Sequence, residues 1–270
     1  MAGEPTALFG VLTYVRIATY NVNGVNGRLP ILLRWLEETE PDVVCLQELK
    51  SPSERFPAGA IAEAGYRAIW HGQARWNGVA ILSRTEPVEI RRALPNDPDM
   101  SQSRYLEAAI NGVLVAGFYA PNGNPWPGPK FDYKLEWLEE LRRHAATMFA
   151  AKAPVVLIGD WNIIPTEKDV YKPERWKDDA LFAPQARALY AAMLADGWTD
   201  ALDRHFKGKP PFTFWHYWRQ SFERDAGIRI DHALLNRHAA KRLIEAGVDR
   251  EARSWPGTSD HAPVWIELKD

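Results

Sequence analysis

The residues best suited to chemistry follow the apolar run Val155–Ile158, where Gly159 precedes Asp160 and Asn162. Four apolar residues that begin with two valines predict a buried strand, which the glycine ends. Side chains two positions apart on an extended chain point the same way, so Asp160 and Asn162 should project together from the carboxyl end of this strand. A carboxylate beside a neutral amide suits a reaction in which one group takes a proton and the other holds an attacking water. The same tripeptide is also typical of a capped turn, because both residues favour turns.

Asp231 and His261 form a second candidate pair. Asp231 lies in the apolar run Ile228–Leu235, where a buried carboxylate is costly unless it is paired. We expect His261 to be its partner, since a carboxylate bound to one imidazole nitrogen fixes the tautomer, raises the pKa and leaves the other nitrogen to face a substrate. An ion pair between Asp231 and Arg229 is the alternative.

Polar side chains also stand at the ends of other predicted strands, and these are Asn21, Glu48 and Tyr119. Each one alone is compatible with an ordinary strand terminus. Asp260 adds a carboxylate immediately before His261. Carboxylate, amide and water oxygens are the ligands that Mg²⁺ or Mn²⁺ prefers, and the sequence has no Cys/His cluster that would indicate zinc. We therefore expect Glu48 and Asp260 to be available to a hard cation.

The remaining pattern shows which elements must position these side chains. Strands are predicted at Arg16–Tyr20, Asp42–Leu46, Tyr66–Trp70, Val79–Ser83, Ala108–Ile110, Val113–Tyr119, Val155–Ile158, Gly227–Leu235 and Pro263–Leu268. Amphipathic helices are predicted at Leu29–Glu40, Phe131–Ala151 and Pro184–Leu194. Because βαβ units alternate with a hairpin at Asn111-Gly112, this order favours two packed sheets with helices outside over one doubly wound sheet.

Composition limits the possible classes of protein. The 270 residues are 46 % hydrophobic and contain no low-complexity linker, so we expect one domain over residues 16–270 after an N-terminal extension over 1–15. The formal net charge is −2, which argues against a globally basic nucleic-acid binder and leaves any polyanion to a local patch. Cys45 is the only cysteine and lies in an apolar run, so it should be buried. With no run of membrane-spanning length, a cytoplasmic monomer without membrane contact is expected.

Five motifs make the chain similar to the exonuclease III family of apurinic/apyrimidinic endonucleases, within the endonuclease/exonuclease/phosphatase superfamily that includes deoxyribonuclease I. They occur in the family's order and are Tyr20–Gly24, Pro41–Glu48, Gly159–Asn162, Arg229–Asp231 and Ser259–Val264. The resemblance implies an α/β fold, a four-layer α/β sandwich in which two packed mixed β-sheets are flanked by helices. This agrees with the predicted order of elements.

The resemblance also implies a role for each predicted site residue. Glu48 would be the principal metal ligand, with Asn21 and Asp260 nearby. Asp160 would activate or orient the attacking water, and Asn162 would position it.

The same resemblance assigns residues to the substrate. His261, held by Asp231, would contact the scissile phosphate, and Tyr119 would donate a hydrogen bond to it. Arg104 falls where the family has a DNA-contacting arginine, and Phe214-Trp215 matches the aromatic residues that line the pocket for the base-free sugar.

Two further segments, one rich in aromatic residues and one rich in proline, should lie beside this site. The aromatic run Phe212–Trp218 could form core, which we expect for Trp218, whereas we expect Phe214 to line the pocket. The proline-rich loop Asn122–Phe131 differs from the best-known members of the family. Such loops decide which DNA ends or lesions are preferred, so that ranking stays open at this stage.

The implied function is a metal-dependent DNA repair nuclease that uses Mg²⁺, with Mn²⁺ as a substitute. It would hydrolyse phosphodiesters in double-stranded DNA at abasic sites, as an AP endonuclease, and at 3′ ends, as a 3′-5′ exodeoxyribonuclease III and 3′-phosphatase or phosphodiesterase. One alternative is a superfamily phosphoesterase that acts on a phosphorylated lipid headgroup or small phosphoester. Another is a non-catalytic nucleic-acid-binding module, which would be expected to lose some site residues, although all of them are present here.

Overall fold

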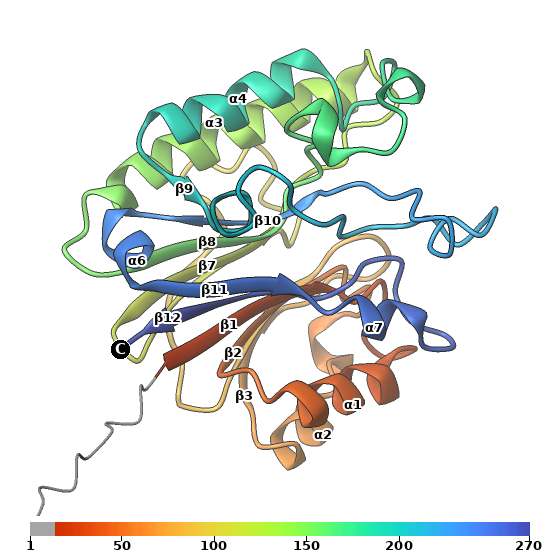
Figure 1. Ribbon diagram of the computed structural model, residues 1–270. Coiled ribbons are helices and arrows are strands. Elements are labelled where there is room, and N and C mark those ends of the chain that lie inside the picture. The colour runs from red at the N-terminus through yellow and green to blue at the C-terminus, as the bar shows by residue number, and fades with distance from the viewer. Residues whose placement is uncertain (1–13) are drawn as a thin grey trace, which may run out of the picture.

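Two six-stranded mixed sheets pack face to face with helices on their outer sides in the computed structural model, which describes residues 14–270 (Figure 1). This confirms the predicted four-layer α/β sandwich. The first strand begins at Tyr14 rather than Arg16, and the rest of the predicted extension over 1–15 lies outside the described residues.

The first sheet has the strand order β11-β12-β1-β2-β4-β3. Its strands are β1 (Tyr14–Asn21), β2 (Val43–Gln47), β3 (Arg67–His71), β4 (Val79–Ser83), β11 (Leu243–Val248) and β12 (Val264–Lys269). Strands β1 and β2 run parallel, with Asn21 opposite Gln47. Asn21 and the next residue after β2, Glu48, therefore emerge at the same end of the sheet.

The second sheet has the order β5-β6-β7-β8-β10-β9. Its strands are β5 (Val88–Arg92), β6 (Tyr105–Ile110), β7 (Val113–Tyr119), β8 (Val155–Asp160), β9 (Thr199–Asp200) and β10 (Asp231–Leu235). The register places Tyr119 of β7 and Asp231 of β10 on either side of Asp160. Strand β10 begins at Asp231, four residues later than predicted, so this aspartate stands at a strand end and not inside the strand.

Helices cover the outer face of each sheet (Figure 1). The first sheet carries α1 (Leu29–Thr39), α2 (Ala58–Glu63) and α7 (Arg250–Ser254), and the second carries α3 (Pro129–Phe149) and α4 (Pro184–Ala195). Two short helices, α5 (Ala201–His205) and α6 (Arg237–Arg242), contribute alanines to the core between the sheets. In the described part of the chain, none of the helices is both long and apolar enough to cross a bilayer.

The core between the sheets fixes their close approach. Aliphatic side chains such as Ile17 and Ile81 of the first sheet pack against Val115 and Ile158 of the second. Cys45 is fully buried in this layer, as predicted. A Cβ at position 117 would lie 2.7 Å from its Sγ, so the sheets can meet here only because residue 117 is glycine.

Candidate active site

A cavity of about 320 Å³ opens where the two sheets end together. Most of the predicted site residues line it, and these are Glu48, Tyr119, Asp160, Asn162, Asp260 and His261. The other two predicted catalytic or metal residues do not line the cavity but bond residues that do: Asn21 bonds Glu48 and Asp160, and Asp231 bonds His261. Segments far apart in the sequence are therefore brought to one place by the parallel pairs β1–β2 and β7–β8 and by the loop before β12.

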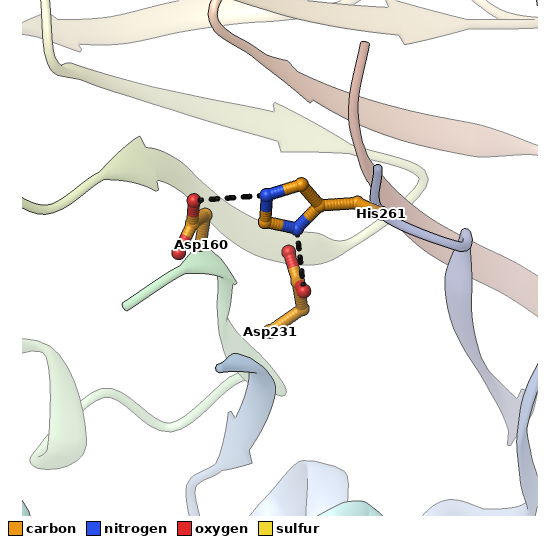
Figure 2. Close-up of side chains that lie close together, drawn as sticks. All are labelled: Asp160, Asp231 and His261. Carbon is orange, nitrogen blue, oxygen red and sulfur yellow. Dashed lines mark hydrogen bonds and ion pairs between the residues drawn. The ribbon is translucent and has the colours of Figure 1, made fainter. Parts of the chain in front are cut away.

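Asp231 and His261 form the predicted hydrogen bond, with Nδ1 of His261 2.9 Å from Oδ2 of Asp231 (Figure 2). The Thr213 hydroxyl donates to the same Oδ2 at 2.6 Å and accepts from the Asp231 backbone N–H at 3.2 Å. Both members of the pair are buried. These contacts fix the direction of the carboxylate, which in turn fixes the orientation of the imidazole ring.

The alternative ion pair between Asp231 and Arg229 is not present. The Arg229 guanidinium instead contacts Asp169 at 2.6 Å and Asp200 at 2.7 Å. In a regular strand Arg229 and Asp231, two positions apart, would share a face, so the sequence pattern left both partners open for Asp231. The strand begins only at Asp231, and Arg229 lies in the segment before it.

The free nitrogen of His261 faces the first candidate acid. Its Nε2 lies 3.8 Å from Oδ2 of Asp160 (Figure 2). Burial lowers the pKa of His261, but the Asp231 carboxylate and its hydrogen bond, with Asp160 behind them, outweigh burial and hold the pKa well above its usual range. The edge of the Phe214 ring packs on the imidazole at a centroid distance of 4.9 Å. His261 is thus a buried cation with one N–H directed at the cavity.

Two hydrogen-bond donors orient the Asp160 carboxylate, and the strand before it packs closely on its neighbour. Its Oδ1 accepts the Asn162 backbone N–H at 2.9 Å, and its Oδ2 accepts from Nδ2 of Asn21 at 2.9 Å. A Cβ at Gly159 would lie 2.0 Å from the Phe118 carbonyl oxygen, so only glycine permits the strand to approach so closely just before Asp160. Burial raises the pKa of the Asp160 carboxyl above its usual range. A carboxylate of raised pKa is a better proton acceptor.

Asn162 has φ of +50°, in the left-handed region, where asparagine is tolerated better than most residues. Its Nδ2 donates to the Ala120 carbonyl at 2.9 Å, and its Oδ1 accepts from Nδ2 of Asn122 at 3.1 Å. The amide is therefore fixed beside Asp160 on the wall of the cavity, as the spacing of the two residues predicts.

Glu48 is surrounded by donors. Its Oε1 accepts from the Tyr119 hydroxyl at 2.8 Å and from Nδ2 of Asn21 at 3.1 Å, and its Oε2 lies 2.7 Å from Nζ of Lys50. Burial raises the pKa of Glu48, but the Lys50 ammonium, together with His261, outweighs burial and lowers it. Glu48 is therefore ionised, and the cation that its carboxylate holds in this structure is Lys50.

The donor set beside Glu48 fits a hard cation. Asp260 lines the same cavity, and its Oδ1 accepts from Nδ2 of Asn23 at 3.0 Å. Asn21 directs its amide nitrogen at Glu48, so a role for Asn21 as a metal ligand remains a prediction. Oxygen ligands of this kind suit Mg²⁺.

A second acidic group is less suitable for a metal. Asp160, Asp231 and His261 offer ligand atoms that all lie within 4.8 Å of one another. Both nitrogens of His261 already face these two carboxylates, so the imidazolium itself supplies the positive charge between them. A metal there would have to displace a proton of the imidazolium, and Glu48 stays the predicted principal metal ligand.

The predicted aromatic residues differ in whether they reach the cavity. Phe214 lines the cavity, as expected. Trp215 is completely buried and donates from Nε1 to Asp225, so it cannot contact DNA directly, and that expectation is corrected. Trp218 is 59 % exposed and stacks on His216 beside the cavity, so the expectation that it lies in the core is wrong.

Arg104 is less accessible than a phosphate ligand should be, because only 9 % of it is exposed. Its Nη1 donates to the Tyr119 carbonyl at 3.2 Å and its Nε donates to Gln102 at 2.8 Å. Its guanidinium lies 5.1 Å from the centre of the Tyr119 ring. Arg104 therefore supports Tyr119 from an adjoining cavity.

Sequence reasoning missed residues that contact the predicted ones. Lys50 pairs with Glu48, Thr213 holds Asp231, and Asn122 bonds Asn162. A positive charge two positions after Glu48 was the one available signal, since no local pattern links Thr213 or Asn122 to its partner.

Comparison with known proteins agrees with this geometry. A model of the endonuclease/exonuclease/phosphatase family matches residues 18–261. The chain is 30 % identical to exodeoxyribonuclease III of Haemophilus influenzae, with 94 % of this chain and 100 % of that protein covered. It superposes on an AP endonuclease from Archaeoglobus fulgidus (33 % identity, TM-score 0.90, 95 % of this chain and 99 % of the other). It also superposes on the 3′ phosphatase NExo from Neisseria bound to a product DNA hairpin (36 % identity, TM-score 0.91, 95 % and 100 %). The chain therefore belongs to the endonuclease/exonuclease/phosphatase family, within its exonuclease III and AP endonuclease group.

Proposed function

We propose that this protein is a metal-dependent DNA repair nuclease that hydrolyses phosphodiesters at abasic sites and at 3′ ends of double-stranded DNA. The observation that carries the proposal is the series of contacts Asp231–His261–Asp160, in which Asp160 and His261 line the same cavity as Glu48. The names of the similar proteins, an exodeoxyribonuclease, an AP endonuclease and a 3′ phosphatase, support DNA as the substrate.

The chemical difficulty is the charge of the phosphodiester, which repels nucleophiles and increases in the transition state. His261 presents a fixed cation to the cavity, because Asp231 keeps its pKa high. The Tyr119 hydroxyl lies in the same cavity, and its one proton, which it donates to Glu48 here, would be free for a phosphate oxygen once the Glu48 carboxylate binds a metal. Fixed charges and donors of this kind contribute several kcal/mol each where water is excluded.

Asp160 and Asn162 handle the attacking water. Asp160 has the raised pKa of a proton acceptor and is oriented by Asn21 and by the Asn162 backbone. The Asn162 side chain is fixed next to it and can hold the water for in-line attack, opposite the leaving oxygen.

The metal we assign to this site is Mg²⁺, with Mn²⁺ as a substitute, held by Glu48 with Asp260 nearby. When bound, it would neutralise charge on the phosphate and on the leaving oxygen. The carboxylate, amide and water oxygens available here favour these ions over zinc.

The aromatic side of the cavity fits the sugar of a nucleotide. Phe214, Trp176 and the exposed Trp218 line it, and flat rings stack on sugars and bases without regard to sequence. We propose that the protein acts as a monomer in the cytoplasm, and that DNA meets a local surface, because the formal net charge of the whole chain is −2.

The experiment is incubation of the protein with a duplex that carries one abasic site, and with a duplex that carries a 3′ phosphate, each with Mg²⁺ or with EDTA. We expect products with Mg²⁺ only. Asp160→Asn should abolish both products, whereas Asp132→Asn, which removes an exposed carboxylate on α3, should change neither. Release of phosphate from a lipid headgroup or a soluble phosphoester with both DNA substrates intact would favour the alternative phosphoesterase. Binding of DNA without any cleavage would favour the non-catalytic module.

A further inference from the structure

Lys134 is a lysine on α3 whose side chain is completely buried. Its Nζ donates to three main-chain carbonyls, those of Asn122 at 3.0 Å, Asn162 at 2.6 Å and Ala180 at 3.1 Å. An ammonium group has three N–H donors, so each donor has one acceptor. The stem packs on Gly123, where a Cβ would lie 2.7 Å from Cδ of Lys134.

The three carbonyls come from three different loops that line the candidate active site. The first follows β7, the second follows β8, and the third precedes α4. Their side chains form a wall of the catalytic cavity, where Asn122, Asn162 and Leu181 all take part. The wall is joined by further bonds, from Nδ2 of Asn122 to Asn162 and from Nδ2 of Asn124 to Asp179. Among the side-chain hydrogen bonds found in residues 14–270, those of Lys134 are the ones that connect one side chain to all three loops.

This arrangement is costly in stability terms. Among the ion pairs found in residues 14–270, none includes Lys134, so the loss of hydration of its charge is offset mainly by carbonyl dipoles, with the Asp179 and Asp160 carboxylates farther away. Burial lowers the pKa of Lys134 to about 7, although Asp179 and Asp160 oppose the shift. Replacement of Lys134 by an apolar residue would leave these three buried carbonyls without their donor, which costs stability. A methionine would fill the same space, so packing alone does not require a lysine here.

We propose that Lys134 is a positioning residue that joins the three loops and holds Asn162 in its place beside Asp160. The contact that matters most is the 2.6 Å bond to the Asn162 carbonyl, because Asn162 has a left-handed backbone and carries the amide that orients the water. This inference rests on the proposed roles of Asp160 and Asn162. Lys134 itself does not reach the cavity surface, so it acts through the loops and not on the substrate.

The test compares Lys134→Met with Lys152→Met, which removes an exposed lysine from the turn after α3. We expect kcat of Lys134→Met to fall by about 10- to 100-fold, as for other small misplacements of a reacting group, while KM for DNA changes by less than about threefold. The salt dependence of DNA binding should not change, because a fully buried lysine releases no counterions. The melting temperature should fall moderately, because three buried carbonyls lose their donor. Lys152→Met should match wild type throughout.

Amide hydrogen exchange gives a measurement that needs no activity. In Lys134→Met, we expect faster exchange in segments 121–126, 161–165 and 178–183 and unchanged exchange in β1 and β2. If methionine is not tolerated, Lys134→Gln keeps a donor to part of the carbonyl set and should give an intermediate result.

Wild-type kcat, or equal exchange in the three segments, would overturn the proposal. So would a large loss of stability with normal kcat for the folded fraction, since that would make Lys134 a structural residue only. If the wild-type protein cleaves no DNA, the proposed function fails, whereas the exchange result still decides whether Lys134 joins the loops.

Discussion

Two buried charged clusters lie next to each other on the segment that leads into β10, and they differ in how fully their groups are paired. In the Arg229 cluster, the guanidinium contacts Asp169, Asp200 and Nδ1 of His232. In the Asp231 cluster, Nε2 of His261 is 3.8 Å from the nearest carboxylate oxygen, and Oδ1 of Asp231 has no hydrogen-bond partner within residues 14–270.

The two histidines show the consequence of this difference. His232 is fully buried, and burial together with the neighbouring Arg229 cation lowers its pKa to about 4. Its Nε2 lies 2.9 Å from the Ile163 carbonyl, so both ring nitrogens have partners. His261 is equally buried, but its main partner is the Asp231 carboxylate, and its pKa is raised. The same side chain is therefore neutral in one cluster and cationic in the other.

The comparison of the two clusters distinguishes a charge that stabilises the fold from a charge that can act on a substrate. A buried charge whose donors and acceptors are all satisfied connects elements, as Arg229 connects the Asp169 turn, the start of α5 at Asp200 and the strand β10. A buried charge that keeps one group free beside a cavity can act on a bound molecule, as His261 can. This difference also explains why partial pairing is expected at functional sites and rare elsewhere.

The largest effect should come from breaking the closed cluster. Arg229→Met leaves the carboxylates of Asp169 and Asp200 without their cation, so we expect a loss of about 3–5 kcal/mol in the free energy of unfolding. Urea unfolding measures it, and Arg237→Met, at an exposed arginine on α6, is the matched control. The pH–rate profile of the folded variant should overlay that of wild type. A shifted profile would show that Arg229 also acts on the catalytic histidine.

Breaking the open cluster should instead change the chemistry. Asp231→Asn removes the carboxylate that raises the pKa of His261, so His261 loses its proton at lower pH than in wild type. Because the protonated form is needed, the upper pH limit of activity should move to lower pH. We expect turnover to fall by about 10²-fold or more, by analogy with other oriented histidines.

The control for Asp231→Asn is its stability. Asparagine can still accept the Thr213 hydroxyl, so the loss in unfolding free energy should be smaller than that of Arg229→Met. A pH–rate profile of Asp231→Asn that coincides with wild type would end the assignment of the pair.

A third change tests the metal assignment. Glu48→Gln keeps the shape of the side chain but removes its charge, so Mg²⁺ affinity in calorimetry should fall by at least about tenfold, the scale on which even indirect partners of a metal act. Asp160→Asn should retain more of the affinity, because we assign the metal to Glu48. The reverse order of the two variants would place the metal between Asp160 and Asp231 instead.

The side chains at strand ends could be predicted from the sequence because each strand carries its own evidence. Apolar runs such as Val155–Ile158 identify buried strands, and the residues that follow them, Asp160 among them, meet at one edge when strands are parallel. The partner of Asp231 could only be proposed, since the choice between His261 and Arg229 depends on where β10 begins and on the distant residues Asp169 and Asp200, which take Arg229 instead. The strand β5 was missed because it is a short edge strand, exposed throughout, in which only Val88 and Ile90 are apolar.

The residues that support the site were harder to predict, because their partners come from distant loops. Lys134 resembles a solvated helix lysine, yet it falls three residues after Phe131 and four before Leu138, in register with the buried face of α3. A charged residue in an apolar stripe of this kind is the signal that could have found it. The resemblance predicts that Arg104 contacts DNA, but its side chain is nearly buried and donates to the Tyr119 carbonyl, a contact that no local pattern indicates.

The smallest effect should come from Arg104, which resembles Arg229 more than it resembles His261. Its Nη1 and Nε are bonded to the Tyr119 carbonyl and to Gln102, and 9 % of the residue is exposed. An arginine that neutralises a phosphate adds about one unit to the slope of log affinity against log salt. Because the Arg104 guanidinium is already desolvated and paired, we expect Arg104→Met to leave this slope unchanged in titrations with abasic duplex. A slope reduced by about one unit would mean that the unpaired Nη2 reaches a phosphate, and Arg104 would then belong with the open cluster and with the predicted DNA contacts.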